Sequence, residues 1–215
     1  MALEKKIATL KLILASASPR RLALLRQIGV EPDYVYATDI DEMPKYKEHP
    51  RFLVKRLAQE KALQAYARMS KLEAYKHSIV LAADTTVSVG RIVLPKPNNN
   101  EDAIECLKLL SGRTHKVFTA LCVINEKGKH SCKISETRVR FARLSEDIIE
   151  AYIASREWED KAGGYAIQGL AAGFITRIVG SYSNVVGLPL ASTVNLLQSY
   201  GYPIFQQWHQ DELRS

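Results

Sequence analysis

The residues best suited to chemistry are charged side chains at the junctions of predicted strands and helices. Leu12–Leu14 is a short apolar run typical of a buried strand, and Pro19 suits the first turn of a following helix. Arg20 and Arg21 stand in that first turn, where the helix dipole disfavours cations. Either both arginines point into solvent or an anion at the helix start offsets the cost.

Two groups of carboxylates follow predicted strands. Three carboxylates, Glu42 among them, come just after the extended segment 34–37, where they could hold a divalent cation or form a solvated acidic turn. Asp84 follows the apolar run 78–83. A carboxylate there is costly unless it is paired, hydrogen bonded or bound to metal, although a strand-ending aspartate that caps a turn looks the same. Asp84 is the best single candidate for chemistry.

Two lysines also stand at constrained positions. Lys61 lies on the apolar stripe of a helix predicted for residues 50–69, so it either snorkels to the helix edge or lines a cleft. Lys96 stands between two prolines after a hairpin predicted at Gly90 and Arg91, which either holds its ammonium group in place or makes a rigid exposed loop. Cations for phosphates and carboxylates for a divalent ion together suit phosphoanhydride chemistry on a nucleotide.

The remaining pattern predicts helices and strands that position these residues. Asn100 is predicted to cap a helix ending at Leu110, and Ser145 a helix over 146–154. His115 has no second histidine at ligand spacing and is interpreted as structural. The other predicted elements are strands at 116–125, 131–143 and 174–179, a glycine-rich loop at 158–169, a turn at 180–184, a final helix ending at 200, and a loosely attached tail after 203.

Composition indicates an ordinary globular protein with a preference for anions. Of its 215 residues, 47% are hydrophobic and 25% charged, and the formal net charge is +7. The basic residues are scattered, which argues against a dedicated nucleic-acid stripe. The three cysteines are odd in number and form no CxxC pair, so a disulfide framework or zinc cluster is not expected, and a reducing cytoplasm is the simplest setting.

Two targeting signals are considered and rejected. Lys5 and Lys6 precede an apolar patch that superficially resembles a signal peptide, but Lys11 interrupts it below the roughly 7 to 15 residues of a signal core. No apolar stretch approaches the roughly 20 residues of a membrane span. We therefore expect no membrane partner and a cytoplasmic location.

Several motifs, in order from Leu12 to Tyr200, resemble the Maf family of nucleoside triphosphate pyrophosphatases, the septum-formation-inhibitor-like proteins. The motifs are Ser16–Arg21, Glu60–Ala62, Ala83–Thr85, Lys96–Pro97, Leu110–His115, Lys161–Gly169 and Asn184–Pro189. Two residues depart from the family pattern, Pro95 and Gly164. Neither is a presumed catalytic group, but Pro95 puts in doubt how Lys96 is presented.

The resemblance implies a fold and an activity. The fold is α/β of the inosine-triphosphatase-like type, a long twisted mixed sheet flanked by helices with a cleft between two lobes. We expect one catalytic domain over residues 1–215, of which 203–215 form a C-terminal tail. The implied activity is hydrolysis of a nucleoside triphosphate to the monophosphate and pyrophosphate with a divalent metal cation, Mg²⁺ or Mn²⁺. A homodimer is plausible.

The resemblance also implies site residues. Asp84 is the implied proton acceptor and Glu42 a metal ligand, with Asp84 also at the metal site. Residues implied to bind the triphosphate are Ser16, Ser18, Arg21, Lys61 and Lys96, of which the two lysines are counted with Asp84 and Glu42 as catalytic. Arg20, Thr85 and Gln168 match the branch acting on dTTP and UTP rather than the branch acting on methylated GTP. A glutamine amide can match both N3–H and O4 of uracil or thymine. Whether Arg20 or Arg21 contacts the base stays open.

Two other functions compete with this interpretation. The first is a non-catalytic regulator of septum formation that binds nucleotide, nucleic acid or protein through its positive surface. The second is removal of modified purine nucleotides. The pyrophosphatase interpretation carries with it protection against incorporation of non-standard nucleotides, a link to cell-division arrest, and no stable nucleic-acid partner.

Overall fold

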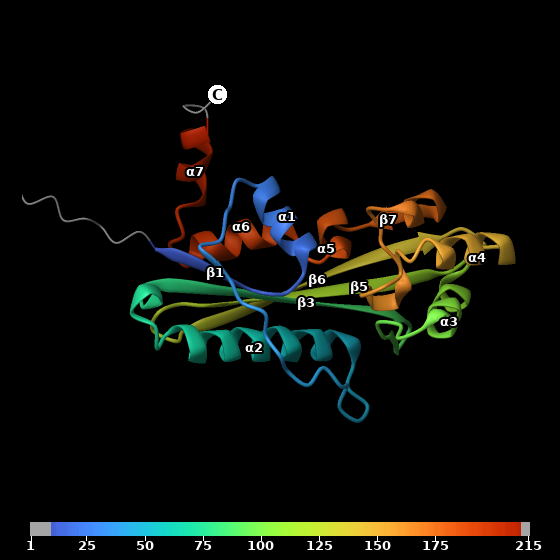
Figure 1. Ribbon diagram of the computed structural model, residues 1–215, viewed down its shortest axis with the longest axis horizontal. Helices are drawn as coiled ribbons and strands as arrows, with labels where there is room; N and C mark the ends of the chain where they lie inside the picture. Colours follow the sequence, from blue (N-terminus) through green and yellow to red (C-terminus); the bar gives the residue numbers. More distant parts are fainter. Residues whose placement is uncertain (1–9, 212–215) are drawn as a thin grey trace, which may run out of the picture.

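A seven-stranded mixed sheet forms the centre of the computed structural model, which describes residues 10–211 (Figure 1). The strand order is β2-β1-β3-β5-β6-β7, with β4 paired to the far end of β3. β1 is parallel to β2 and β3, and the other pairs are antiparallel. The strands are β1 Lys11–Ala15, β2 Tyr34–Val35, β3 Ser78–Val89, β4 Ile92–Leu94, β5 Thr114–Ile124, β6 His130–Phe141 and β7 Ile175–Val179.

Helices cover both faces of this sheet. The α-helices are α1 Pro19–Gln27, α2 Pro50–Met69, α3 Asn100–Leu110, α4 Glu146–Ala154, α5 Tyr182–Val186, α6 Leu190–Ser199 and α7 Ile204–Asp211. Three 3₁₀ turns, Glu73–Tyr75, Ala162–Gly164 and Leu170–Phe174, complete the elements. Within residues 10–211, no helix is both long enough and apolar enough to cross a membrane. The predicted long mixed sheet flanked by helices is confirmed.

Side chains alternate along each strand, so the two faces of the sheet pack against different helices. Leu12 and Leu14 of β1 point to a core shared with α1 and α6, whereas Ile13 and Ala15 point to a core shared with α2. Figure 1 shows α2 along one face and α1 with α6 along the other. Side chains of a strand alternate between faces, so one buried strand supplies both cores.

The helix predicted over residues 50–69 is α2, and its apolar stripe is buried as expected. The helix begins at Pro50, where His49 caps it by accepting a hydrogen bond from Arg51 N at 3.2 Å. Small side chains at Ala58, Ala62 and Ala65 pack against the sheet. The close approach that they allow brings the inner face of α2 against β3.

The strand that carries Asp84 is longer than predicted. The sequence indicates a strand ending at Ala83 with Asp84 beyond it, and this is wrong, because β3 runs on to Val89 and Asp84 lies within it. The later residues of β3 pair with β5 and with β4, so the polar Thr86 and Ser88 belong to the strand as well. The predicted hairpin at Gly90 is confirmed, since Val89 pairs with Ile92.

Several predicted boundaries need correction. Asn99, not Asn100, caps α3, and its Oδ1 accepts from Asp102 N at 2.8 Å; three consecutive asparagines are equivalent in sequence, and only the extended backbone of Asn99 selects it. Ser145 caps α4 as predicted. The segment predicted as a turn at 180–184 enters helix α5, and Gly187 and Pro189 separate it from α6.

The tail predicted to be loosely attached is packed as far as Trp208. Ile204 is buried at 1% exposure, and the Trp208 indole N–H donates to the Ile28 carbonyl at 2.6 Å. An apolar anchor and a hydrogen bond to the α1 end therefore hold α7. Lys5 and Lys6, on which the signal-peptide question turned, lie outside the described residues, as do 212–215.

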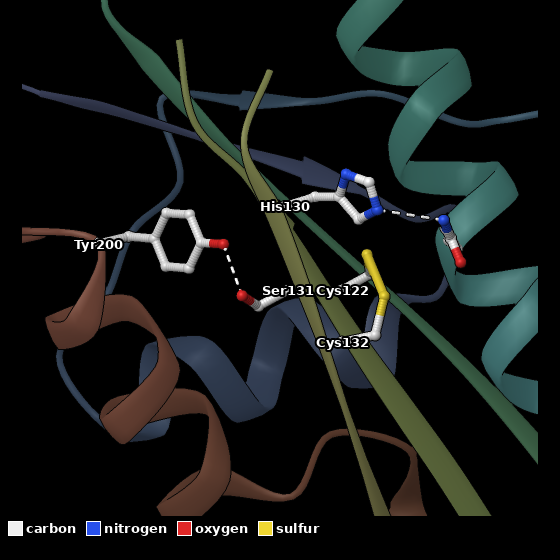
Figure 2. Close-up of a disulfide and its surroundings, with 6 residues drawn as sticks. Cys122, His130, Ser131, Cys132 and Tyr200 are labelled. Carbon is white, nitrogen blue, oxygen red and sulfur yellow. Dashed lines mark hydrogen bonds between the residues drawn. A yellow bond between two sulfur atoms is a disulfide. The ribbon is translucent and has the colours of Figure 1, made fainter. Parts of the chain in front are cut away.

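Two of the three cysteines form a disulfide, which contradicts the sequence expectation. Cys122 of β5 and Cys132 of β6 are direct partners in the strand register, with their Cα atoms 4.1 Å apart (Figure 2). Cys106 is free and buried. The expectation failed because the hairpin register, and not the spacing of cysteines along the chain, decides which of them meet.

Candidate active site

The ten predicted site residues all line one pocket of about 790 Å³. They are Ser16, Ser18, Arg20, Arg21, Glu42, Lys61, Asp84, Thr85, Lys96 and Gln168. They come from the β1–α1 turn, the segment before α2, α2 itself, β3, the segment after β4, and the loop before the third 3₁₀ turn. The pocket brings them together, while the role of each stays a prediction.

The centre of the pocket is a lysine held between two carboxylates. Lys61 Nζ lies 2.6 Å from Glu42 Oε1 and 2.7 Å from Asp84 Oδ1. Lys61 and Asp84 are only 8% and 5% exposed. Lys96 Nζ lies 3.7 Å from the other oxygen of the Glu42 carboxylate, Oε2. Of the two interpretations of Lys61, the structure therefore supports the one in which it lines a cleft.

The two carboxylates have pKa values shifted in opposite directions. Burial raises the pKa of Asp84, although the charges of Lys61 and Arg21 oppose the rise. Burial also acts to raise the pKa of Glu42, but its hydrogen bond to Lys61 and the charges of Lys61, Lys96 and Arg21 outweigh it, so this pKa is lowered. Neighbouring carboxyls separated in this way suit different tasks, one exchanging a proton and the other staying ionised.

Arg21 is fixed by three hydrogen bonds. Its guanidinium donates from Nε to the Gly187 carbonyl at 2.9 Å, from Nη1 to Ser16 Oγ at 3.1 Å, and from Nη2 to Thr85 Oγ1 at 3.1 Å. Burial lowers the pKa of Arg21 below its usual value, with the Asp84 charge opposing this. Arg21 thus joins the β1–α1 turn, β3 and the α5–α6 connection into one wall.

The side chains of Arg20 and Ser18, in the same turn, make fewer hydrogen bonds than that of Arg21. Arg20 Nη2 reaches the Asp160 carbonyl at 3.4 Å, across the pocket. Burial lowers the pKa of Arg20, and the Asp160 charge opposes that change. The side chain of Ser18, at the start of α1, makes no capping hydrogen bond. Both groups are therefore placed to meet an anion at the helix N-terminus.

The loop that carries Gln168 is anchored beside Lys96. Gly163 has φ of 70°, a left-handed conformation that favours glycine, and its N–H donates to the Pro95 carbonyl at 3.0 Å. A Cβ on Gly163 would lie 2.9 Å from Val87 Cγ1. The glycine-rich loop could have been a surface turn or a place of close backbone approach, and at Gly163 it is a close approach to Val87 and Pro95.

Sequence reasoning assigned no role to three further residues around this loop. Lys161 lines the pocket, and burial lowers its pKa, as does the Arg20 charge. Asp160 also lines it, and Glu157 Oε2 accepts from Leu170 N at 2.8 Å, two residues beyond Gln168. The charged run 157–161 immediately before Gly163 is the signal that could have indicated them.

The donors suit a metal that arrives with its substrate. Among residues 10–211, no group of three or more His, Cys, Asp and Glu side chains could hold a metal ion. Glu42 and Asp84 supply carboxylate oxygens from two sides of the pocket. Mg²⁺ is commonly bound through one or two carboxylates plus substrate phosphates, so these two residues fit such an ion.

The pocket combines several cations with two carboxylates whose pKa values are shifted in opposite directions. This arrangement suits the class of proteins that bind a phosphate-bearing ligand. Residues 11–200 match the family described as Maf-like protein, and the chain belongs to this family. The predicted family membership is confirmed.

Named relatives cover almost the whole chain. A protein of Bartonella quintana (strain Toulouse) named dTTP/UTP pyrophosphatase is 57% identical over 207 residues, which is 93% of this chain and 91% of that protein. One of Brucella abortus (strain 2308) with the same name is 54% identical over 92% of this chain and 95% of that protein. The solved Ham1 protein of Staphylococcus aureus matches 61% of this chain and 72% of that chain, with 16% identity and a TM-score of 0.43.

Proposed function

We propose that this protein is a metal-dependent nucleoside triphosphate pyrophosphatase that hydrolyses dTTP and UTP to the monophosphate and pyrophosphate. The observation that carries the proposal is the contact of buried Lys61 with buried Asp84 and with the more exposed Glu42, inside a cation-lined pocket. The names of the Bartonella and Brucella relatives support the substrate.

Asp84 is the proposed proton acceptor. Its pKa is raised by burial, which makes it a better base than an ordinary aspartate, and it takes a proton from the water that adds across the anhydride between the α and β phosphates. Glu42, whose pKa is lowered, stays ionised. With the nucleotide bound, Glu42 and Asp84 would hold Mg²⁺ or Mn²⁺, which neutralises phosphate charge and acidifies water.

Charge developing on the phosphates is stabilised by fixed cations. Lys61 and Lys96 lie beside different oxygens of the Glu42 carboxylate, so a triphosphate entering the pocket meets two ammonium groups already oriented. Ser18 and the start of α1 complete the phosphate side. The triphosphate competes with Glu42 for both lysines.

Gln168 and Arg20 are the proposed base-reading residues. Gln168 offers an amide that matches N3–H and O4 of uracil or thymine. The hydrogen bonds of Arg21 to Gly187, Ser16 and Thr85 use three of its five N–H groups and fix its guanidinium, whereas Arg20 makes one long hydrogen bond, which favours Arg20 as the arginine that contacts the base. Thr85 contributes indirectly by holding Arg21.

A nucleotide panel with Mg²⁺ or Mn²⁺ tests the proposal. We expect pyrophosphate release from UTP and dTTP, and loss of turnover by a factor of at least roughly 100 in Asp84→Asn, with an unchanged circular dichroism spectrum. Asp147→Asn, on the exposed side of α4, is the matched control and keeps full activity. Full activity of Asp84→Asn would remove Asp84 as the base, and turnover confined to purine nucleotides would overturn the substrate assignment.

The cellular setting is proposed on the same basis. We place the enzyme in the cytoplasm, where it limits incorporation of non-standard nucleotides, with a link to cell-division arrest and assembly as a homodimer. Light scattering at micromolar concentration measures the assembly. The alternative, a non-catalytic regulator of septum formation, requires nucleotide binding without any pyrophosphate release in the same panel.

A further inference from the structure

A second pocket, of about 700 Å³, opens at the end of the sheet where β5 begins and β6 ends. Its polar lining comprises Ser111, Arg113, Arg140, Arg143 and Thr176. None of its lining residues belongs to the candidate active site. The volume falls within the range of small-molecule sites, roughly 300 to 1,000 Å³.

The walls of this pocket are fixed by backbone hydrogen bonds. Gly112, with φ of 68°, donates its N–H to the Ala142 carbonyl at 2.9 Å. Leu144 N donates to Ser111 Oγ at 2.8 Å, which leaves the Ser111 hydroxyl proton for another acceptor. These hydrogen bonds hold the segment after α3 beside the segment after β6. The backbone positions of the arginines on both segments are therefore fixed.

Three arginines of the pocket have no partner within the described chain. The side chains of Arg113, Arg140 and Arg143 are exposed and make no hydrogen bond or ion pair with residues 10–211. Elsewhere in residues 10–211, the exposed Arg26, Arg138 and Arg156 pair with carboxylates, whereas Arg51, Arg68 and Arg91 are unpaired and isolated. The pocket differs because three unpaired arginines line it together. The cations of the pocket are therefore concentrated without local compensation.

The sheet adds a like-charge pair at the same place. Arg140 of β6 stands directly opposite Arg177 of β7 in the strand register. Like charges directly opposite each other on neighbouring strands destabilise a sheet. Neither side chain has a carboxylate partner among residues 10–211. A bound anion would therefore offset the repulsion between the two positive charges.

We propose that this pocket is a second anion site, which binds a small phosphate-bearing molecule such as pyrophosphate or a nucleotide. Guanidinium groups bind phosphate oxygens in a bidentate manner, and the Ser111 hydroxyl adds a donor. The short extent of the unpaired arginines favours a small ligand over a polynucleotide, since Arg138, the next cation along β6, is paired with Glu136. The second site shares no residue with the proposed active site, and only the expectation of a first class of pyrophosphate site, at the active site, rests on the proposed function.

Calorimetric titration of the full chain with inorganic pyrophosphate, without metal, tests the second site. We expect two classes of site in the wild type. Arg113→Ala/Arg143→Ala should lose one of them, with binding at least about tenfold weaker because charge-assisted hydrogen bonds are removed. Arg68→Ala/Lys71→Ala removes two exposed cations at the end of α2 and should keep both classes.

The same titration with UMP shows whether the second site binds a nucleotide, pyrophosphate or both. Binding of either ligand at this site supports the proposal. A pyrophosphate isotherm unchanged in Arg113→Ala/Arg143→Ala overturns it. Loss of binding only to a single-stranded oligonucleotide, or loss only of self-association in light scattering, also overturns it in favour of a macromolecular surface. UTP turnover of this variant without added pyrophosphate should match the wild type, so failure here is separate from failure of the proposed function.

Discussion

At the scale of single residues, the two carboxylates of the active-site pocket share one cation but respond to it differently. Lys61 contacts both Asp84 and Glu42, yet burial dominates the pKa of Asp84 whereas the neighbouring cations dominate that of Glu42. The difference follows from exposure, because Glu42 is 43% exposed at its side chain and Asp84 only 8%.

The pH dependence of turnover should report Asp84. Because Asp84 must be ionised to accept a proton and burial raises its pKa, kcat/KM should fall as pH decreases through a value above the ordinary aspartate range. Lys61→Met removes the charge that opposes this rise, so the acid limb should move to higher pH and kcat/KM should fall roughly 100-fold. Lys61→Arg, which keeps the charge, should move it less. An acid limb at the same pH in Lys61→Met would contradict the coupling.

His115 should make stability depend on pH. It is 1% exposed, and burial lowers its pKa from 6.5 to about 4, while its Nε2 and the Tyr165 hydroxyl are 2.8 Å apart. The unfolded chain therefore binds the proton first, so the stability contributed by neutral His115 is complete above pH 6.5 and is lost as pH falls towards 4. One pKa unit corresponds to about 1.4 kcal/mol, which gives a loss of about 2 kcal/mol between pH 6.5 and 5.

Urea unfolding of the wild type and of His115→Gln at pH 7 and pH 5 measures this loss. Between pH 7 and pH 5, the free energy of unfolding should fall by about 2 kcal/mol more in the wild type than in the variant. Identical pH dependence in both proteins would assign the effect to other groups.

At the scale of elements, the position of Lys96 depends on a contact between the β3–β4 hairpin and the glycine loop. Gly163 donates to Pro95, the residue before Lys96, and lies against Val87 of β3. Pro95 departs from the family pattern, but proline lacks only the backbone N–H. Its carbonyl therefore remains available to accept this hydrogen bond.

Gly163→Ala should disturb both stability and substrate binding. The new Cβ meets Val87 Cγ1 at 2.9 Å and the φ of 70° is strained for alanine, so the free energy of unfolding should fall by about 2 kcal/mol. KM for UTP should rise as the Pro95 contact loosens. Gly173→Ala, with nothing within 4 Å of its Cβ, is the control and should stay within about 0.5 kcal/mol. Equal thermal unfolding midpoints for the two variants would refute the proposed contact.

At the scale of the whole molecule, contacts at the start of β6 join both faces of the sheet. The Tyr200 hydroxyl donates to Ser131 at 2.8 Å, and Gln59 of α2 lies 3.1 Å from His130 Nε2, beside the disulfide (Figure 2). The disulfide links two strands that are already paired, at a place whose cysteines do not line the active-site pocket.

Thiol counting in the denatured protein should find one free thiol, that of Cys106, without reductant and three with it. Cys122→Ala/Cys132→Ala should lower the free energy of unfolding by about 3 kcal/mol, as expected for a bridge across a sequence separation of 10. UTP turnover should not change. Three thiols in protein purified without reductant would show that the bridge does not form, in keeping with the predicted reducing compartment.

The sequence by itself determined most helices and strands, because apolar periodicity, capping residues and turn glycines act within a few neighbours. It indicated the family and the site residues through the resemblance of motifs from Ser16 to Pro189. Only the tertiary structure decided which groups meet. Lys61 and Asp84 are 23 residues apart, and Arg21 and Gly187 are 166 apart. Strand register placed Asp84 within a strand, joined Cys122 to Cys132 and set Arg140 opposite Arg177, since pairing depends on partners that local sequence does not contain.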